Sequence, residues 1–269
     1  MRPPVPTELS QHNPRIAQVH DLRTARGRRD QGRFIAEGPT LLEEAARSGL
    51  RPRELYASAE GLTRFDAGRW EADGVPVYLV PDRVLARLSD VESPAGILAV
   101  LDLPERSLSE ILAGAGPVLL LAAVSDPGNA GTLVRSAEAF GAAGVLFGRG
   151  GADPYAPKVI RAAMGSSFRL PVAVVDADEI LAAAAAAGRP MVALDLAGEA
   201  LPVVGIPRDA VIAVGNERHG VRGWLPRWDR AVRIPQQATA ESLNAAVAGS
   251  LALYEATRCQ ESCQVAEKP

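Results

Sequence analysis

Residues 117–148 read PVLLLAAVSDPGNAGTLVRSAEAFGAAGVLFG, and this stretch decides the fold class. An apolar run leads into a polar turn, a helix is predicted from Gly131 to Gly141, and a second apolar run ends at Gly148. Continuous apolar runs are typical of parallel strands that are covered on both faces. The stretch therefore predicts a strand, a helix and a parallel neighbouring strand of an α/β fold.

The same alternation continues toward the carboxyl end of the chain. Helices are predicted at 157–168 and 177–188, and a final helix begins near residue 240. Further strands are predicted at 170–175, 190–196, 209–216 and 230–235. Residues 116–269 therefore form one predicted parallel-sheet domain.

A second, smaller α/β pattern precedes this domain. Strands and helices alternate from about residue 31 to residue 104, after an amphipathic, Arg-rich helix predicted over residues 14–30. Residues 1–13 are polar and Pro-rich, and residues 105–115 form a predicted linker. A chain of 269 residues exceeds the usual size of one domain. We therefore expect two domains, 1–104 and 116–269.

Composition excludes several classes of protein. The net charge of −3 gives no global field that attracts nucleic acid, so a polyanion site needs local clustering. Cys259 and Cys263 are the only cysteines, and we interpret them as incidental thiols, with no metal site expected. Because no stretch resembles a secretory leader or a membrane span, we expect a cytoplasmic protein.

Polar residues gather in three loops that follow predicted strands. The first loop contains the turn Pro127-Gly128-Asn129, and the helix after it carries Arg135. The second loop is 215-GNERHG-220. The third loop, 234-IPQQATAESLNAA-246, leads into the last helix, which Ser242 or Glu241 can cap. Open parallel sheets bind ligands at the carboxyl ends of their strands. The three loops are therefore candidate parts of one site.

A dinucleotide site is the first alternative to consider for the loop at 125–131. That loop lacks the G-x-G-x-x-G pattern, and no acidic residue ends a following strand about twenty residues later. The residues therefore disfavour a nicotinamide or flavin cofactor.

The three loops, in this order, resemble the signature motifs of the SpoU/TrmH family of RNA 2′-O-ribose methyltransferases in the SPOUT superfamily. The resemblance lies in NAGTLVRSAEAFGAAG (129–144), VGNERHGV (214–221) and IPQQATAESLNAAVA (234–248), and it covers residues 116–256. The part from FIAEGPTLLEEAARSG to ESPAGILAV resembles the small substrate-binding domain that many members carry in front. The resemblance implies a knotted (trefoil) parallel-sheet methyltransferase domain preceded by a small α/β RNA-binding domain.

The resemblance also implies a cofactor, S-adenosylmethionine, that is held by the three loops. Backbone groups at the strand ends would read its polar edges, and apolar side chains would form the walls. The candidate cofactor-binding residues are Leu194, Asp195, Gly198, Val214, Gly215, Asn216, Gly220, Ile234, Pro235, Ser242, Leu243 and Ala246.

The implied reaction is attack of a ribose 2′-hydroxyl on the sulfonium methyl. The candidate catalytic residues are Arg135, Asn129, Glu217, Ser242 and Asn244. A guanidinium is effectively never deprotonated in proteins, so we expect Arg135 to hold the adjacent phosphate and to stabilise the developing oxyanion. The proton would leave through phosphate, water or Glu217.

The resemblance further implies a homodimer with RNA as its partner, and ribosomal RNA of the large subunit (23S) as the substrate. Residues expected to hold RNA are Arg26, Arg28, Arg29, Arg33 and Arg161. Methylation of tRNA and an RNA-binding module without turnover remain as alternatives. The sequence leaves open whether methylation confers antibiotic resistance.

Overall fold

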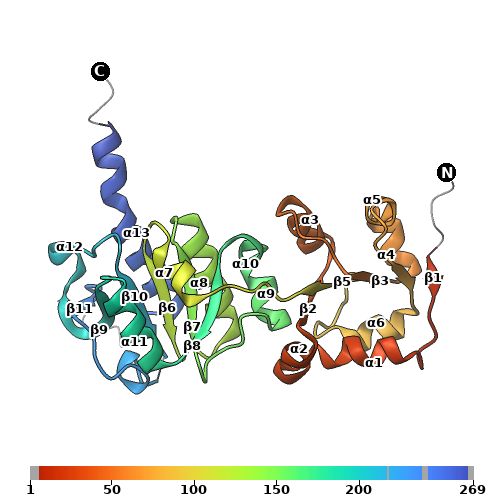
Figure 1. Ribbon diagram of the computed structural model, residues 1–269, viewed down its shortest axis with the longest axis horizontal. Coiled ribbons are helices and arrows are strands. Elements are labelled where there is room, and N and C mark those ends of the chain that lie inside the picture. Colours follow the sequence, from red (N-terminus) through yellow and green to blue (C-terminus); the bar gives the residue numbers. More distant parts are fainter. Residues whose placement is uncertain (1–5, 217, 238–241, 266–269) are drawn as a thin grey trace. The chain divides into compact units, whose positions relative to one another are not determined.

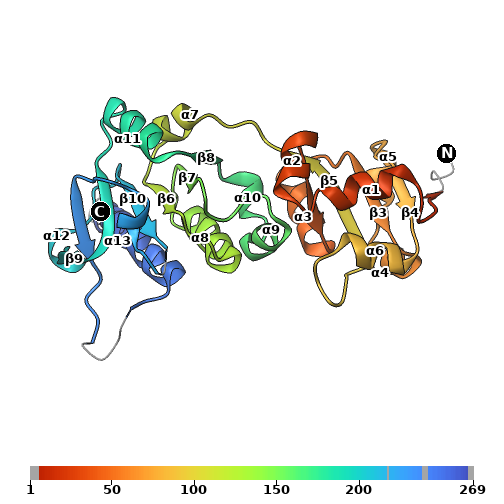
Figure 2. The ribbon, with the colours of Figure 1, turned by 90° about the horizontal axis from the view of Figure 1, so that it is seen from below.

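The computed structural model describes residues 6–216, 218–237 and 242–265, with the backbone alone for Arg69 and residues 259–265. Two compact units emerge. The front unit comprises Met1–Glu105 with Tyr155–Phe168, and the carboxyl-terminal unit comprises Arg106–Pro154 with Arg169–Pro269. Figures 1 and 2 show the elements of each unit from two directions. Sequence had assigned residues 155–168 to the carboxyl-terminal domain, whereas their contacts group them with the front unit.

The front unit is built on a five-stranded mixed sheet with the strand order β1-β4-β3-β5-β2. β5 runs antiparallel to β2 and β3, whereas β4 is parallel to β3 and β1. The strands are β1 (Thr7–Glu8), β2 (Arg33–Glu37), β3 (Glu54–Ala57), β4 (Val77–Leu79) and β5 (Ile97–Asp102). The helices are α1 (Pro14–Asp21), α2 (Ala25–Gln31), α3 (Pro39–Arg47), α4 (Ala59–Arg64), α5 (Gly68–Ala72), α6 (Asp82–Leu88) and α9 (Pro157–Ala163).

Both faces of this sheet are buried. Along β5, Ile97, Ala99 and Leu101 belong to a core that includes residues of α3 and α5, and the alternate residues Leu98 and Val100 belong to a core with α1 and α6. Figure 1 shows these two pairs of helices on opposite sides of the sheet. Successive strand side chains point to opposite faces, which explains why β5 is apolar throughout.

The prediction of a single helix over residues 14–30 is wrong, because the structure has two helices there. The chain breaks at Leu22, which is buried, and Thr24 caps the second helix by accepting a hydrogen bond from Gly27 N at 3.0 Å. A Cβ on Gly27 would lie 2.1 Å from the carbonyl oxygen of Asp21. Glycine at this position therefore allows α2 to pack against the end of α1.

The carboxyl-terminal unit contains a six-stranded sheet with the order β11-β9-β10-β6-β7-β8, and all of its pairs are parallel. Its strands are β6 (Val118–Ala122), β7 (Gly144–Gly148), β8 (Val172–Val175), β9 (Met191–Ala200), β10 (Val211–Gly215) and β11 (Arg230–Arg233). Its helices are α7 (Leu108–Ala113), α8 (Pro127–Ala139), α11 (Ala177–Ala186), α12 (Leu201–Val204), the 3₁₀ turn η1 (Val221–Gly223) and α13 (Ala245–Val265). α10 (Ser166–Arg169) spans the junction of the units.

Helices cover both faces of this sheet, as the apolar strands predict. Every residue of β6 and β7 is buried. Figure 2 shows α7 and α11 on one side of the sheet, and α8 and α13 on the other. The parallel α/β fold predicted from residues 117–148 is thus confirmed. Within the described residues, no helix combines the length and the hydropathy that a membrane span requires.

Candidate active site

The middle of β9 and the carboxyl end of β10 border a cavity of about 570 Å³, here named the motif pocket. Small-molecule sites usually measure about 300–1,000 Å³. Three separate segments of the chain form its wall. The lining residues are Leu194, Asp195, Leu196, Val214, Gly215, Asn216, Arg218, His219, Gly220, Val221, Arg222, Val232, Arg233, Ile234, Gln236, Ser242, Leu243, Ala245 and Ala248.

The first segment of the wall comes from a bulge in β9. The register between β9 and β11 jumps from Ala193 to Glu199, so that residues 194–198 leave the ladder. Asp195 lies in this bulge, and its Oδ2 accepts a hydrogen bond from Nε of Arg222 at 2.8 Å. The ion pair therefore joins the first wall segment to the second.

The second segment is the loop after β10, which Asn216 holds in place. Its Nδ2 donates to the carbonyl oxygen of Ala123 and contacts Ser125 Oγ, both at 3.2 Å, and its Oδ1 accepts from Arg218 N at 2.9 Å. A Cβ on Gly215 would lie 2.0 Å from the carbonyl carbon of Gly220. Glycine at 215 thus lets the loop fold back closely onto the strand end.

The third segment leads into α13, and Asn244 caps that helix. Asn244 Oδ1 accepts hydrogen bonds from the backbone N–H groups of Ala246 at 2.8 Å and Val247 at 3.3 Å. The predicted helix start near residue 240, with Ser242 or Glu241 as the cap, is therefore wrong, since α13 begins at Ala245. Ser242 is exposed and lines the motif pocket, and Glu241 lies outside the described residues.

Asn244 also joins α13 to the start of α8. Its Nδ2 donates to Oδ1 of Asn129 at 2.9 Å. Asn129 lies within α8, whose first turn Asp126 caps by accepting from Asn129 N at 2.7 Å. The prediction that Asn129 lies in a turn before the helix is thus wrong, because Pro127 already occupies the first helical position. The structure does bring the predicted residues Asn129 and Asn244 together.

Arg135 lies on α8 but does not line the motif pocket. A separation of six residues places its side chain about 120° around the helix from Asn129. Its side chain is exposed and forms no ion pair or hydrogen bond with the described residues. The guanidinium therefore remains available for an anion. Glu217, the other predicted acid–base candidate, lies outside the described residues.

Most of the predicted cofactor-binding residues do line the motif pocket, and Gly198, Pro235 and Ala246 do not. A Cβ on Gly198 would lie 2.5 Å from the backbone nitrogen of Val232, so this glycine serves the close approach of β9 and β11. Ala246 is buried in the first turn of α13. Pro235 is exposed between two lining residues.

Sequence reasoning missed several polar residues of the pocket wall. Gln236 lines the pocket, and its Oε1 atom is buried without a hydrogen-bond partner among the described residues. Arg218 and His219 also line it, and their position inside the GNERHG loop could have indicated this. The contribution of Arg222 depends on its pairing with Asp195, 27 residues away, for which the sequence carries no pattern.

The arginines that were expected to hold RNA differ in their surroundings. Arg28 is only 3% exposed and donates from Nη1 to the carbonyl oxygen of Leu22 at 2.7 Å, so its prediction as a phosphate contact is wrong. Arg26 forms an exposed ion pair with Asp30, and Nε of Arg33 lies 4.0 Å from Oδ1 of Asp102. Arg29 is exposed and forms no contact of this kind with described residues.

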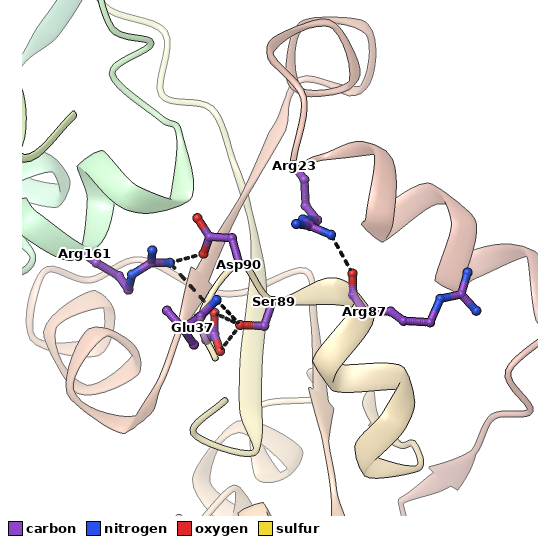
Figure 3. Close-up of polar contacts among 7 residues, drawn as sticks. Arg23, Glu37, Arg87, Ser89, Asp90 and Arg161 are labelled. Carbon is purple, nitrogen blue, oxygen red and sulfur yellow. Dashed lines mark hydrogen bonds and ion pairs between the residues drawn. The ribbon is translucent and has the colours of Figure 1, made fainter. Parts of the chain in front are cut away.

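Arg161, the fifth of these arginines, faces two carboxylates of the front unit (Figure 3). Its Nη1 pairs with Asp90 and lies 4.0 Å from Oε2 of Glu37, whose side chain is 7% exposed. Burial raises the pKa of Glu37, and a hydrogen bond from Ser89 together with the positive charge of Arg161 opposes that rise. The structure thus places Arg161 in a partly exposed ion pair within the front unit.

No group of three or more His, Cys, Asp or Glu side chains suited to a metal ion occurs within the described part of the chain.

Comparison with known proteins gives two matches to family models. Residues 116–254 match the SpoU rRNA Methylase family, and residues 13–99 match the MRM3-like substrate binding domain. Together the two matches cover both predicted domains.

Individual relatives match over almost the whole chain. A 23S rRNA (guanosine(2553)-2′-O)-methyltransferase, RlmP, of Bacillus subtilis is 34% identical over 91% of this chain and 96% of its own length. A 23S rRNA (uridine(2479)-2′-O)-methyltransferase of Streptomyces viridochromogenes is 29% identical over 100% of this chain and 98% of its own.

Solved structures agree with these matches. An AdoMet-bound rRNA methyltransferase from Sinorhizobium meliloti has a TM-score of 0.82 at 28% identity, covering 94% of this chain and 98% of its own. The SpoU methyltransferase AviRb from Streptomyces viridochromogenes, in complex with AdoMet, has a TM-score of 0.80 at 29% identity, covering 93% and 99%. The chain with the motif pocket and the Asn129–Asn244 bridge therefore belongs to the SpoU rRNA methylase family, whose members transfer a methyl group from S-adenosylmethionine to RNA.

Proposed function

We propose that this RNA 2′-O-methyltransferase acts on large-subunit (23S) rRNA, as a homodimer in the cytoplasm. The observation that carries the proposal is the motif pocket, whose wall includes two of the three family motifs, 214–221 and 234–248. Two relatives with nearly full coverage are named as 23S rRNA methyltransferases, and residues 13–99 match a substrate binding domain. Both findings favour rRNA over tRNA.

The motif pocket fits an adenosyl cofactor in size and in chemistry. Leu194, Val214 and Leu243 supply apolar wall, and the buried Oε1 of Gln236 is an acceptor that requires a donor. A bound nucleoside carries amino and hydroxyl groups that can satisfy such an atom. When bound, S-adenosylmethionine supplies a methyl group activated by the positive charge of its sulfonium.

The bridge between Asn244 and Asn129 fixes the wall of this pocket to α8. Because Asn244 is also the cap of α13, one side chain sets the position of two helix starts. The carboxamide group of Asn129 is then a fixed polar group near the reacting ribose. We assign to both residues the task of aligning the pocket and the substrate, since alignment supplies much of the acceleration in such a displacement.

Arg135 contributes as a permanent cation. Its guanidinium presents a rigid fork of donors that matches a phosphate. We assign it to the phosphate beside the target ribose and to the charge that develops on the 2′-oxygen. The proton of that hydroxyl leaves to phosphate, to water or to Glu217.

One face of α13 supports the homodimer. Val247, Leu251 and Tyr254 are 48%, 42% and 48% exposed, and their spacing of four and three residues places them on one side of the helix. Tyr254 also packs edge-on against Phe140, with ring centroids 5.8 Å apart. An apolar stripe of this kind needs a covering surface, and a second copy of the same helix face provides one.

The proposed function is tested with purified protein, methyl-labelled S-adenosylmethionine and a mixture of in vitro transcribed 23S rRNA, 16S rRNA and tRNA. We expect label in 23S rRNA alone, in a form that resists alkaline cleavage at one nucleotide. Label in tRNA alone would contradict the substrate assignment. Binding of RNA without transfer to any of the three would indicate a silent RNA-binding module.

The same assay tests Arg135 against a matched control. We expect Arg135→Ala to lower transfer by about 100-fold or more, in line with the loss of one oxyanion-stabilising group, while cofactor binding is retained. Arg227 is another exposed arginine of the same unit that does not line the motif pocket, and Arg227→Ala should leave transfer unchanged.

A further inference from the structure

The segment Tyr155–Phe168 has an unusual path. It follows β7 in the sequence, yet it belongs to the front unit, and the chain returns to the carboxyl-terminal unit at Arg169. Ile160 of this segment is fully buried in the front unit's core. Tyr155 and Phe168 both pack on Phe34, with ring centroids 5.2 and 6.2 Å apart. The segment is therefore an integral part of the front unit.

The backbone at the end of α9 also packs closely against the front unit. Met164 and Gly165 both have left-handed backbone conformations, with φ of 50° and 87°. A Cβ on Gly165 would lie 2.6 Å from Cβ of Glu44 on α3. A left-handed conformation is unfavourable for a non-glycine residue, and its presence indicates that the surrounding contacts dictate the turn.

The polar contacts of the segment concentrate on Arg161 (Figure 3). It pairs with Asp90 and lies near Glu37, to which the Ser89 hydroxyl donates at 2.7–2.8 Å. Ser89 Oγ in turn accepts from Val91 N at 3.1 Å. These partners come from the end of β2 and from the loop after α6, so one guanidinium ties α9 to two other parts of the front unit.

We propose that Arg161 is a positioning residue that, through Asp90 and Glu37, locks residues 155–168 into the front unit. While this segment stays in the front unit, the chain passes between the units at three peptide bonds, 105–106, 154–155 and 168–169. Release of the segment would leave the bond at 105–106 as the single link. A longer and more flexible connection lowers the effective concentration of the carboxyl-terminal unit near an RNA that the front unit holds. The inference rests on the proposed function, since the front unit must hold the RNA.

The test compares Arg161→Ala and Asp90→Asn with the parent enzyme. Each variant removes one side of the ion pair. For both we expect KM for 23S rRNA to rise about tenfold and kcat to change less than twofold, with unchanged affinity for S-adenosylmethionine. Arg161→Lys, which keeps the charge, should restore part of the affinity. A fall in kcat at constant KM would instead indicate partial unfolding and would overturn the proposal.

Asp90→Asn separates this role from direct contact between Arg161 and RNA. If Arg161 held a phosphate, loss of the neighbouring negative charge would leave KM unchanged or lower it. A rise in KM with an unchanged salt dependence supports the positioning role, and a lowered or unchanged KM overturns it.

Limited proteolysis tests the lock without RNA. Segment 155–168 should become cleavable in Arg161→Ala and Asp90→Asn but stay protected in the parent enzyme. Equal protection in all three would overturn the proposal even if methyl transfer proceeds. Absence of methyl transfer in the parent enzyme would contradict the proposed function while leaving this measurement interpretable.

Discussion

At the scale of single residues, Asn244 has two separable tasks. Its Oδ1 caps α13, and its Nδ2 binds Asn129. Asn244→Asp keeps the acceptor and removes the donor, so we expect normal thermal stability and a fall in methyl transfer of about tenfold or more. Asn244→Ala removes both and should also lower stability by about 1 kcal/mol, the usual value of such a cap.

Thermal melting and methyl transfer of the two variants distinguish these tasks. Full activity of Asn244→Asp would show that the bridge to Asn129 has no part in the reaction. The sequence predicted both residues as site members, because they lie in recognisable motifs. It could not predict their hydrogen bond, which spans 115 residues.

Glu37 provides a prediction on pH. Because burial raises its pKa above the ordinary value of 4.5, the folded protein retains the proton at pH values where the unfolded chain has lost it. The contribution of this group to stability therefore falls as the pH rises from 4.5 toward the raised pKa. Glu37→Gln cannot ionise, so the melting temperature of this variant relative to the parent should rise over that range.

Melting curves between pH 4 and pH 8 (about half a unit apart) check this dependence. Glu60→Gln, at an exposed carboxylate of the same unit, serves as the control. A difference for Glu37→Gln that stays constant with pH would contradict the assignment.

At the scale of helices and strands, sequence patterns located most elements and missed their ends. Apolar runs identified the strands from β2 to β11, because buried strands need apolar residues on both faces, but not β1, which lies in the polar stretch 1–13. The helix starts at Pro127 and Ala245 were missed, since Asp126 and Asn244 act as caps through contacts that composition does not reveal. The order of the strands depends on packing and is likewise absent from local pattern.

Gly249 in α13 gives the prediction at this scale. A Cβ there would lie 2.4 Å from Leu133 Cδ2 on α8 and 3.0 Å from Val214 Cγ2 on β10. Alanine normally stabilises a helix interior by about 1 kcal/mol relative to glycine, but overpacking costs about 1–3 kcal/mol. We expect Gly249→Ala to lower the melting temperature.

Chemical denaturation of Gly249→Ala and of the double variant Gly249→Ala/Leu133→Ala measures this balance. The second substitution removes the clashing atom, so the double variant should lose less stability than the sum of the two single variants. Additive effects would show that the helices are free to move apart.

At the scale of the whole molecule, the apolar stripe of α13 makes a prediction about assembly. Leu251→Glu places a charge among Val247 and Tyr254, and such a charge is costly to bury in an interface. In sedimentation equilibrium we expect dimers for the parent and monomers for this variant. Arg227→Glu, which alters an exposed charge of the same unit outside this helix, should remain dimeric.

An already monomeric parent protein would contradict the dimer, and so would a variant that dimerises equally well. The dimer was expected from family resemblance alone, whereas the exposed stripe is a property of the folded chain. The sequence pattern also predicted a single domain boundary, between residues 104 and 116. It could not show that residues 155–168 rejoin the front unit, because only tertiary contacts bring Ile160 beside Phe34.

This rejoining has a consequence for synthesis on the ribosome. Domains near the amino end usually fold first, as soon as they leave the ribosome. Here the emerging front unit lacks Ile160, Tyr155 and Phe168 until translation has passed residue 168, by which time β6, α8 and β7 have also emerged. The substrate-binding part therefore matures only after the methyltransferase part has begun to form, and a nascent chain paused near residue 105 exposes an unfinished apolar surface to chaperones.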